Sequence, residues 1–251
     1  MTVTPSLITA QDEVARICQD LLRIDTTNFG GNEGMGERKA AEYVMELLHE
    51  VGIQPELFES APGRANVVVR LPGADPTRPA LVLHGHLDVV PAEASEWSVN
   101  PFGGEEIDGM LWGRGAVDMK DMVAMMLAVV RQMAREDRLP ARDIVLAFFA
   151  DEEAGGEYGA HYAVTERPDL FEGATEAISE VGGYSTMING QRAYLLQTAE
   201  KSLGWMRLIA EGRAGHGSQI AEDNAVVQLA AAITRIGQHN WPHQITPTVD
   251  E

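Results

Sequence analysis

The sequence predicts an α/β fold: a mostly parallel sheet with helices on both faces, followed by the start of a small α+β domain. Short apolar segments typical of strands alternate with amphipathic helical segments between residues 11 and 179. This alternation is typical of parallel strands joined by helices that cover the sheet. Beyond residue 200 the pattern changes to one alternating segment and one amphipathic helix.

The first part of the chain is predicted to form two helices joined by a glycine-rich loop. Apolar residues recur three and four positions apart in residues 11–24 and again in residues 37–51, which is the period of a helix. Gly52 then supplies a stop signal. The glycine-rich loop occupies residues 28–36.

Apolar segments bounded by turn residues follow, and each is expected to form a strand. The expected strands are residues 66–71, 80–83, 109–117, 143–150 and 176–179. The expected helices between them are residues 119–135 and 159–165.

A second domain is expected to begin near residue 200. Residues 202–211 alternate like a half-exposed strand, and residues 223–237 have a helical pattern that opens on the cap-like Asp223 and Asn224. We therefore expect a catalytic portion at residues 1–199 and part of a second domain at residues 200–251. One strand and one helix are too little to bury a core, so we expect the chain to be a C-terminally truncated fragment.

Composition limits the partners of the protein. The 38 acidic and 19 basic residues give a formal net charge of −19, which repels a nucleic-acid backbone. The single cysteine, Cys18, excludes an internal disulfide and a cysteine-rich zinc site. The longest apolar run, residues 122–130, is far shorter than the ~18 residues of a membrane span. Because the N-terminus also lacks the pattern of a signal peptide, we expect a cytoplasmic protein without membrane partners.

Acidic residues and a histidine follow four of the apolar segments, at the end where open α/β sheets place their sites. These residues are His86, Asp88, Asp118, Glu152, Glu153 and Glu180. Carboxylates crowded at one edge repel each other unless a cation lies between them, and histidine with carboxylates is a common zinc ligand set.

Each of these residues also has an ordinary explanation. Asp118 fits a helix N-cap, and Glu152 and Glu153 fit a solvated loop after a buried strand. Four such coincidences in succession favour a site. Asp88 is placed to accept a hydrogen bond from His86, and neighbours in an extended segment point apart, so one of the two glutamates would bind metal while the other acts as general base.

Five motifs resemble those of the M20 family of metallohydrolases: HGHLDVVP, GRGAVDMK, DEEAGG, SEVGG and GRAGHGS. That family includes acetylornithine deacetylase, succinyl-diaminopimelate desuccinylase, aminoacylase and glutamate carboxypeptidase. The resemblance covers nearly the whole chain. It implies a zinc-exopeptidase-like catalytic domain and a small lid or dimerisation domain.

The resemblance also implies a ligand set for two zinc ions, with Co²⁺ or Mn²⁺ as alternative metals. His86 and Glu180 would hold one zinc, and Asp118 would bridge to the second. Glu153 would bind the second zinc. The peptide bond between Asp118 and Met119 is typically cis in this family.

Three further roles follow from the resemblance. Glu152 would be the general base, Asp88 would orient His86, and His216 would stabilise the oxyanion in the active site of a partner subunit, which implies a homodimer. The family's last zinc ligand is a histidine near the C-terminus, and neither His239 nor His243 matches its placement. Activity of the truncated chain is therefore an open question.

The resemblance favours hydrolysis of the amide bond of a small N-acyl amino acid, because a glutamate at the Glu180 position accompanies deacylases more often than peptidases. A dipeptidase or carboxypeptidase that cleaves a dipeptide is the first alternative. The others are a non-catalytic relative that binds metal or dimerises, and a metal-free hydrolase that uses paired carboxylates.

Overall fold

The computed structural model describes residues 8–180, 185–194, 204, 206–218, 223–243 and 245–246. Contacts between Cα atoms divide the chain into two compact units, Met1–Glu180 and Val181–Glu251. The predicted boundary after residue 199 lies outside the described residues and stays a prediction.

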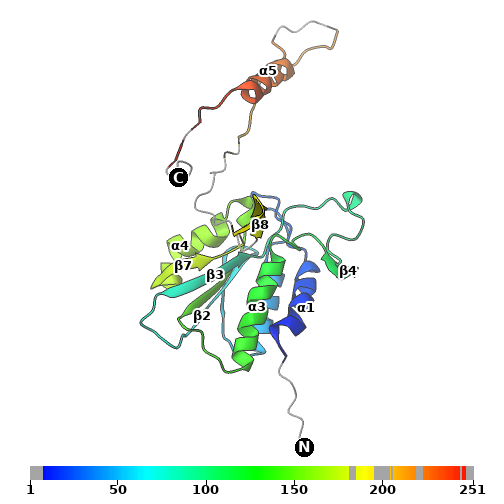
Figure 1. The fold of residues 1–251 in the computed structure, drawn as a ribbon. Helices are drawn as coiled ribbons and strands as arrows, with labels where there is room; N and C mark the ends of the chain where they lie inside the picture. The colour runs from blue at the N-terminus through cyan, green and yellow to red at the C-terminus, as the bar shows by residue number, and fades with distance from the viewer. Residues whose placement is uncertain are drawn as a thin grey trace, which may run out of the picture. The chain divides into compact units, whose positions relative to one another are not determined.

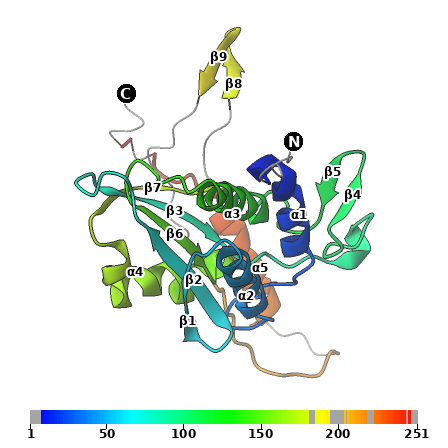
Figure 2. The same cartoon turned by 90° about the horizontal axis from the view of Figure 1, so that it is seen from below.

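The first unit is built on a five-stranded sheet with the order β1-β2-β6-β3-β7. Figure 1 shows this sheet, and Figure 2 labels each of its strands. β3 runs parallel to both β6 and β7, whereas β2 is antiparallel to β6 and to β1. Four of the five strands therefore point the same way, which confirms the predicted mostly parallel sheet. The strands are β1 (Glu56–Ala61), β2 (Arg64–Leu71), β3 (Ala80–His86), β6 (Ile144–Phe149) and β7 (Ala174–Ile178).

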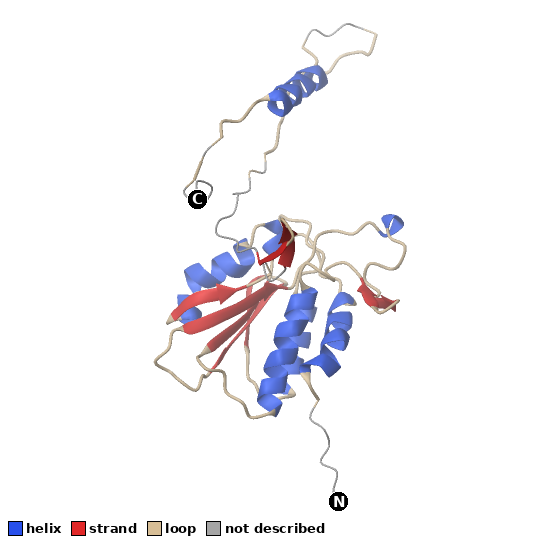
Figure 3. Cartoon of the chain, in the orientation of Figure 1, coloured by secondary structure: helices blue, strands red, loops and turns tan. Residues whose placement is uncertain are grey.

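Helices cover both faces of this sheet (Figures 2 and 3). On β2, Val67 packs in one apolar core with the helices α1 to α3, while its neighbour Val68 packs in a second core with Ala163 of α4. Adjacent strand residues point to opposite faces, so both faces are buried. The helices are α1 (Ala10–Leu22), α2 (Arg38–His49), α3 (Lys120–Arg135) and α4 (Tyr162–Glu166), and short turns flank α4 at Glu157–His161 and Pro168–Phe171.

The predicted strand at residues 109–117 is wrong. Only β5 (Met110–Trp112) is a strand, and it pairs with β4 (Glu105–Ile107) in a separate hairpin. The chain then turns, because Gly115 has a φ of +87° and a Cβ there would lie 2.7 Å from Val89. Asp118 therefore reaches the sheet edge from a loop and not from a strand.

The second unit contains two described elements that differ in how well they were predicted. The helix α5 (Ala225–Gln238) confirms the prediction, and the side chain of Asn224 accepts hydrogen bonds from the amides of Val226 and Val227. The hairpin of β8 (Ser185–Ile188) and β9 (Gln191–Tyr194) was not predicted, although its Asn-Gly turn is a hairpin signal.

The predicted strand at residues 202–211 does not appear in its described part. Residues 206–211 have no regular structure, while residues 202, 203 and 205 lie outside the described residues. A strand needs a hydrogen-bonded neighbour, and these six residues pair with none of the described strands.

No helix in the described ranges is both long enough and apolar enough to cross a membrane.

A buried ion pair joins α1 to α3. Arg131 donates to both carboxylate oxygens of Glu13, and their side chains are 5% and 4% exposed. Arg135 also contacts Glu13, and Arg131 reaches the carbonyl of Leu47. Loss of the arginine would leave a buried carboxylate with a single cationic partner.

We predict that Arg131→Met lowers the free energy of unfolding by about 3 kcal/mol, because the buried carboxylate of Glu13 loses part of the positive charge that compensates its burial. Urea unfolding followed by circular dichroism measures this change. Arg16→Met is the matched control, since Arg16 pairs with Asp20 on the surface of α1, the helix that carries Glu13, and such pairs contribute roughly 0.5 kcal/mol. Equal effects of the two substitutions would contradict the prediction.

Candidate metal centre

Three parallel strands deliver most of the predicted site residues to one edge of the sheet. His86 is the last residue of β3, Asp151 to Glu153 follow β6, and Glu180 follows β7. The carboxyl ends of parallel strands lie at the same edge, which is where open α/β sheets form their sites.

Three of these side chains meet at His86. Its Nε2 lies 3.0 Å from Oδ1 of Asp118 and 3.3 Å from Oε2 of Glu180. One ligand atom of each residue lies within 4.8 Å of the others, as required for ligands of a single ion. Glu152 is close by, with Oε2 at 3.9 Å from the same nitrogen.

The donor set fits a metal ion. Oε2 of Glu180 is buried and has no hydrogen-bond partner among the described residues, although it faces the imidazole. A buried acceptor without a donor is costly unless a cation satisfies it. One histidine with two carboxylates is a donor set that zinc accepts.

The other ring nitrogen of His86 faces Asp88. Nδ1 lies 2.9 Å from the backbone carbonyl oxygen of Asp88 and 3.4 Å from its Oδ1. A proton on Nδ1 therefore has an acceptor, which leaves Nε2 to bind a metal. The predicted neighbour is in place, but the carbonyl oxygen is nearer than the predicted carboxylate.

Electrostatics at the edge are dominated by negative charge. Burial alone would lower the pKa of His86, but the nearby carboxylates of Asp88 and Glu180 raise it to about 11. Burial and the charge of Asp118 raise the pKa of Glu153 to about 7. Among the described residues no lysine or arginine lies within 4.0 Å of these acidic groups. A bound cation would relieve this imbalance.

Glu152 and Glu153 lie on a single helical turn (Glu152–Ala154) and not in the extended segment that the sequence predicted. The turn forms because Asp151 adopts a left-handed conformation with a φ of +65°. The side chain of Glu152 is half exposed, and burial raises its pKa. Glu153 is near the cluster but is not one of its three members.

A cavity of about 180 Å³ opens beside the cluster and gives it room for a small molecule. His84, Phe149 and Ala160 line it together with His86, Glu152 and Glu180. Burial lowers the pKa of His84, so this ring favours its neutral form.

Two resemblance-based expectations differ in outcome. The bond between Asp118 and Met119 is cis, as expected. His216 belongs to the second unit, where its Nδ1 lies 2.8 Å from Oγ of Ser218. Its predicted role in a partner's site stays a prediction.

Sequence reasoning missed three buried polar residues that adjoin the site: Asn28, Arg64 and Asp151. Asn28 lies in the predicted glycine-rich loop, and Arg64 lies two residues before the expected start of its strand. Neither position carries a sequence pattern that indicates burial.

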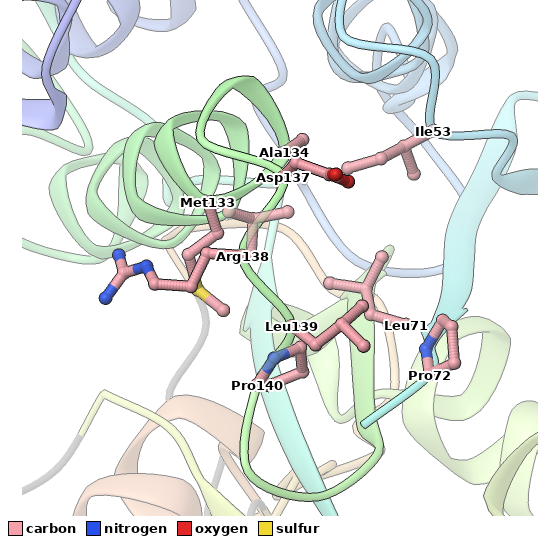
Figure 4. Close-up of a pocket in the computed structure, with 10 residues that line it drawn as sticks. Ile53, Leu71, Pro72, Met133, Ala134, Asp137, Arg138, Leu139 and Pro140 are labelled. Carbon is pink, nitrogen blue, oxygen red and sulfur yellow. The ribbon is translucent and has the colours of Figure 1, made fainter. Parts of the chain in front are cut away.

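A second hollow of about 140 Å³ lies at the opposite end of the sheet, where β2 ends and β6 begins (Figure 4). Its lining is mostly apolar and includes Ile53, Leu71 and Leu139. None of the predicted site residues lines it.

These features define a protein with a candidate metal centre at the carboxyl edge of an α/β sheet. The model of the peptidase family M20/M25/M40 matches residues 82–248. The chain belongs to this family, which confirms the resemblance found in the sequence.

Aminoacylase-1 of Sus scrofa is 33% identical over 198 residues, which are 78% of this chain and 47% of that protein. The N-fatty-acyl-amino acid synthase/hydrolase PM20D1 of Xenopus tropicalis is 28% identical over 249 residues, 95% of this chain and 48% of that protein. The chain thus spans about half the length of the curated relatives it matches.

Solved structures support the fold. Human carnosine dipeptidase 1 has a TM-score of 0.57 at 23% identity. The match covers 67% of this chain and 38% of that protein. The M20 family metallo-carboxypeptidase Sso-CP2 of Sulfolobus solfataricus has a TM-score of 0.57 at 21% identity. The match covers 67% of this chain and 37% of that protein.

We predict that zinc binding at pH 7 releases at least about one proton, because His86 is protonated in the metal-free chain and must be neutral to bind metal. The pKa of His86 lies above 7, so the apparent zinc affinity rises with pH until that pKa is reached. Calorimetric titration in two buffers of different ionisation enthalpy counts the protons. Binding without proton release would contradict the prediction.

Proposed function

We propose that the chain supplies the catalytic portion of a zinc-dependent hydrolase that cleaves the amide bond of N-acyl amino acids. The observation that carries this proposal is the meeting of His86, Asp118 and Glu180, with Glu152 beside them. The relatives named aminoacylase favour an N-acyl amino acid as substrate. A dipeptide is the alternative substrate.

In this proposal His86, Asp118 and Glu180 would hold the first zinc, and Glu153 with Asp118 would contribute to a second. Bound zinc supplies a Lewis acid for the amide carbonyl and lowers the pKa of a coordinated water. Asp88 contacts Nδ1 of His86 and would thereby leave Nε2 to bind the metal.

Glu152 is the proposed general base. Its carboxylate lines the cavity near Nε2 of His86, and burial raises its pKa, which favours a role as a proton acceptor. Glu152 would accept the proton of the attacking water. It would then pass that proton to the leaving nitrogen as the amide C–N bond breaks.

Other parts of the proposal come from family resemblance. They are that zinc is used in place of Co²⁺ or Mn²⁺ and that His216 stabilises the oxyanion in a partner subunit of a homodimer. A cytoplasmic location is also proposed, on the sequence pattern alone.

A substrate panel tests the proposed reaction. The zinc-loaded protein is offered N-acetyl, N-succinyl and N-fatty-acyl amino acids beside dipeptides of matched amino acids. We expect chelator-sensitive release of the free amino acid from at least one N-acyl substrate. Faster cleavage of dipeptides would favour a dipeptidase, and activity that survives the chelator would refute a metal-dependent reaction.

We predict that Glu152→Gln lowers kcat by roughly 10²–10⁴-fold, the usual contribution of a general base, and leaves zinc bound. Glu157→Gln is the matched control, since Glu157 is an exposed glutamate on the segment that follows. Steady-state kinetics and elemental analysis measure the two effects. Retained turnover in Glu152→Gln would reject the assignment of the base.

A further inference from the structure

A buried chain of hydrogen bonds connects Arg64 to Asp88, whose carboxylate contacts His86, and it begins at residues that belong to none of the proposed catalytic groups. It passes through Asn28. Arg64, Asn28 and Asp88 are 2%, 4% and 0% exposed. Three polar side chains buried this completely must satisfy one another.

Asn28 uses every hydrogen-bonding position of its side chain. Nδ2 donates to Oδ2 of Asp88 and to Oδ1 of Asp151, both at 2.9 Å. Oδ1 accepts from Nη2 of Arg64 and from the amide of Gly30, both at 3.0 Å. One amide therefore links the carboxylate that follows β3 to the carboxylate that follows β6.

Arg64 determines which way this amide points. A guanidinium only donates, so it requires the oxygen of Asn28 on its side and leaves the NH₂ group for the two carboxylates. Arg64 is itself fixed by Glu37, whose Oε1 is 2.6 Å from Nη1, and by Asn32, whose Oδ1 is 2.9 Å from Nε.

The backbone sets Asn28 in register with the end of β3. Its backbone amide donates to the carbonyl oxygen of Val89 at 2.9 Å, and the amide of Val89 donates to the carbonyl oxygen of Thr26 at 3.2 Å. A bridge between Thr27 and Val89 completes this pairing. The side chain of Asn28 is thereby held beside Asp88.

Asp88 connects the Asn28 side chain to the residues of the metal centre. Oδ1 accepts from the amide of Glu152 at 3.0 Å and Oδ2 from the amide of Glu153 at 3.1 Å. The same carboxylate lies 3.4 Å from Nδ1 of His86. Asn28 shares Oδ2 with Glu153, so removal of Asn28 frees the buried carboxylate to rotate away from the two amides.

We propose that Asn28, oriented by Arg64, is a positioning residue that fixes Asp88 and through it the ring of His86 and the turn that carries Glu152 and Glu153. This inference rests on the proposed function, because its consequence is the affinity of the metal centre. Outer partners of metal ligands typically contribute 10–100-fold to metal affinity.

The test compares Asn28→Ala and Arg64→Lys with the unchanged 251-residue chain. Zn²⁺ affinity is measured by competition with a chelating indicator, and the visible spectrum of bound Co²⁺ reports the ligand geometry. In both variants we expect zinc affinity to fall by about 10–100-fold and the Co²⁺ bands to change. Arg64→Lys keeps the charge beside Glu37, so it serves where Asn28→Ala does not fold.

Asn66→Ala is the matched control. Asn66 is buried like Asn28, but within the described part of the chain its side chain bonds only to the backbone of Arg64, Ala150 and Tyr158. We expect it to lower thermal stability and to leave the Co²⁺ spectrum unchanged. Equal losses of zinc affinity with unchanged spectra in the Asn28 and Asn66 variants would overturn the proposal.

Nitrogen-15 resonances of the His86 ring in the metal-free chain separate this proposal from the proposed function. We expect Asn28→Ala to shift them and Asn66→Ala to leave them in place. Unchanged resonances in Asn28→Ala would overturn the inference. A wild-type chain that binds no zinc would instead reject the proposed function.

Discussion

Repulsion among five carboxylates around one imidazole is the constraint on which the arrangement of the sheet edge depends. The carboxylates belong to Asp88, Asp118, Glu152, Glu153 and Glu180. Asp88 receives hydrogen bonds from Asn28 and from two backbone amides. Burial would raise its pKa, but His86, Asn28 and the amide of Glu153 hold that pKa below the usual range. The other four depend on His86 or on solvent, and they therefore form the part of the edge where a cation binds most favourably.

The fold brings these groups together by two routes. Parallel pairing of β3 with β6 and β7 places their carboxyl ends in line, so His86, Glu152 and Glu180 follow from topology alone. Asp118 has no strand to position it. The close approach of Gly115 to Val89 and the bonds from Lys120 to the carbonyls of Leu21 and Ile24 fix the base of its loop.

The sequence was sufficient to predict what depends on local pattern. The helices α1 to α3, the strands β3 and β6 and the cap of α5 follow from hydrophobic period and turn residues, and each lies within a few residues of its expected position. β1 was missed because half of the residues in Glu56–Ala61 are polar and none is fully buried at this edge of the sheet. The segment 109–117 was misassigned because its apolar residues resemble a strand, while its glycines require a turn.

The buried network was beyond sequence reasoning for a different reason. Asp151, Glu152 and Glu153 are three successive acidic residues, yet each has its own environment. Asp151 is buried and accepts from Asn28 and from the amide of Tyr158, Glu152 is half exposed, and Glu153 has a raised pKa. These differences arise from the left-handed turn at Asp151 and from partners more than eighty residues distant along the chain, such as Asn28. Local pattern identifies which residues are chemically able to bind a metal, whereas the long-range hydrogen bonds decide how each of them is oriented.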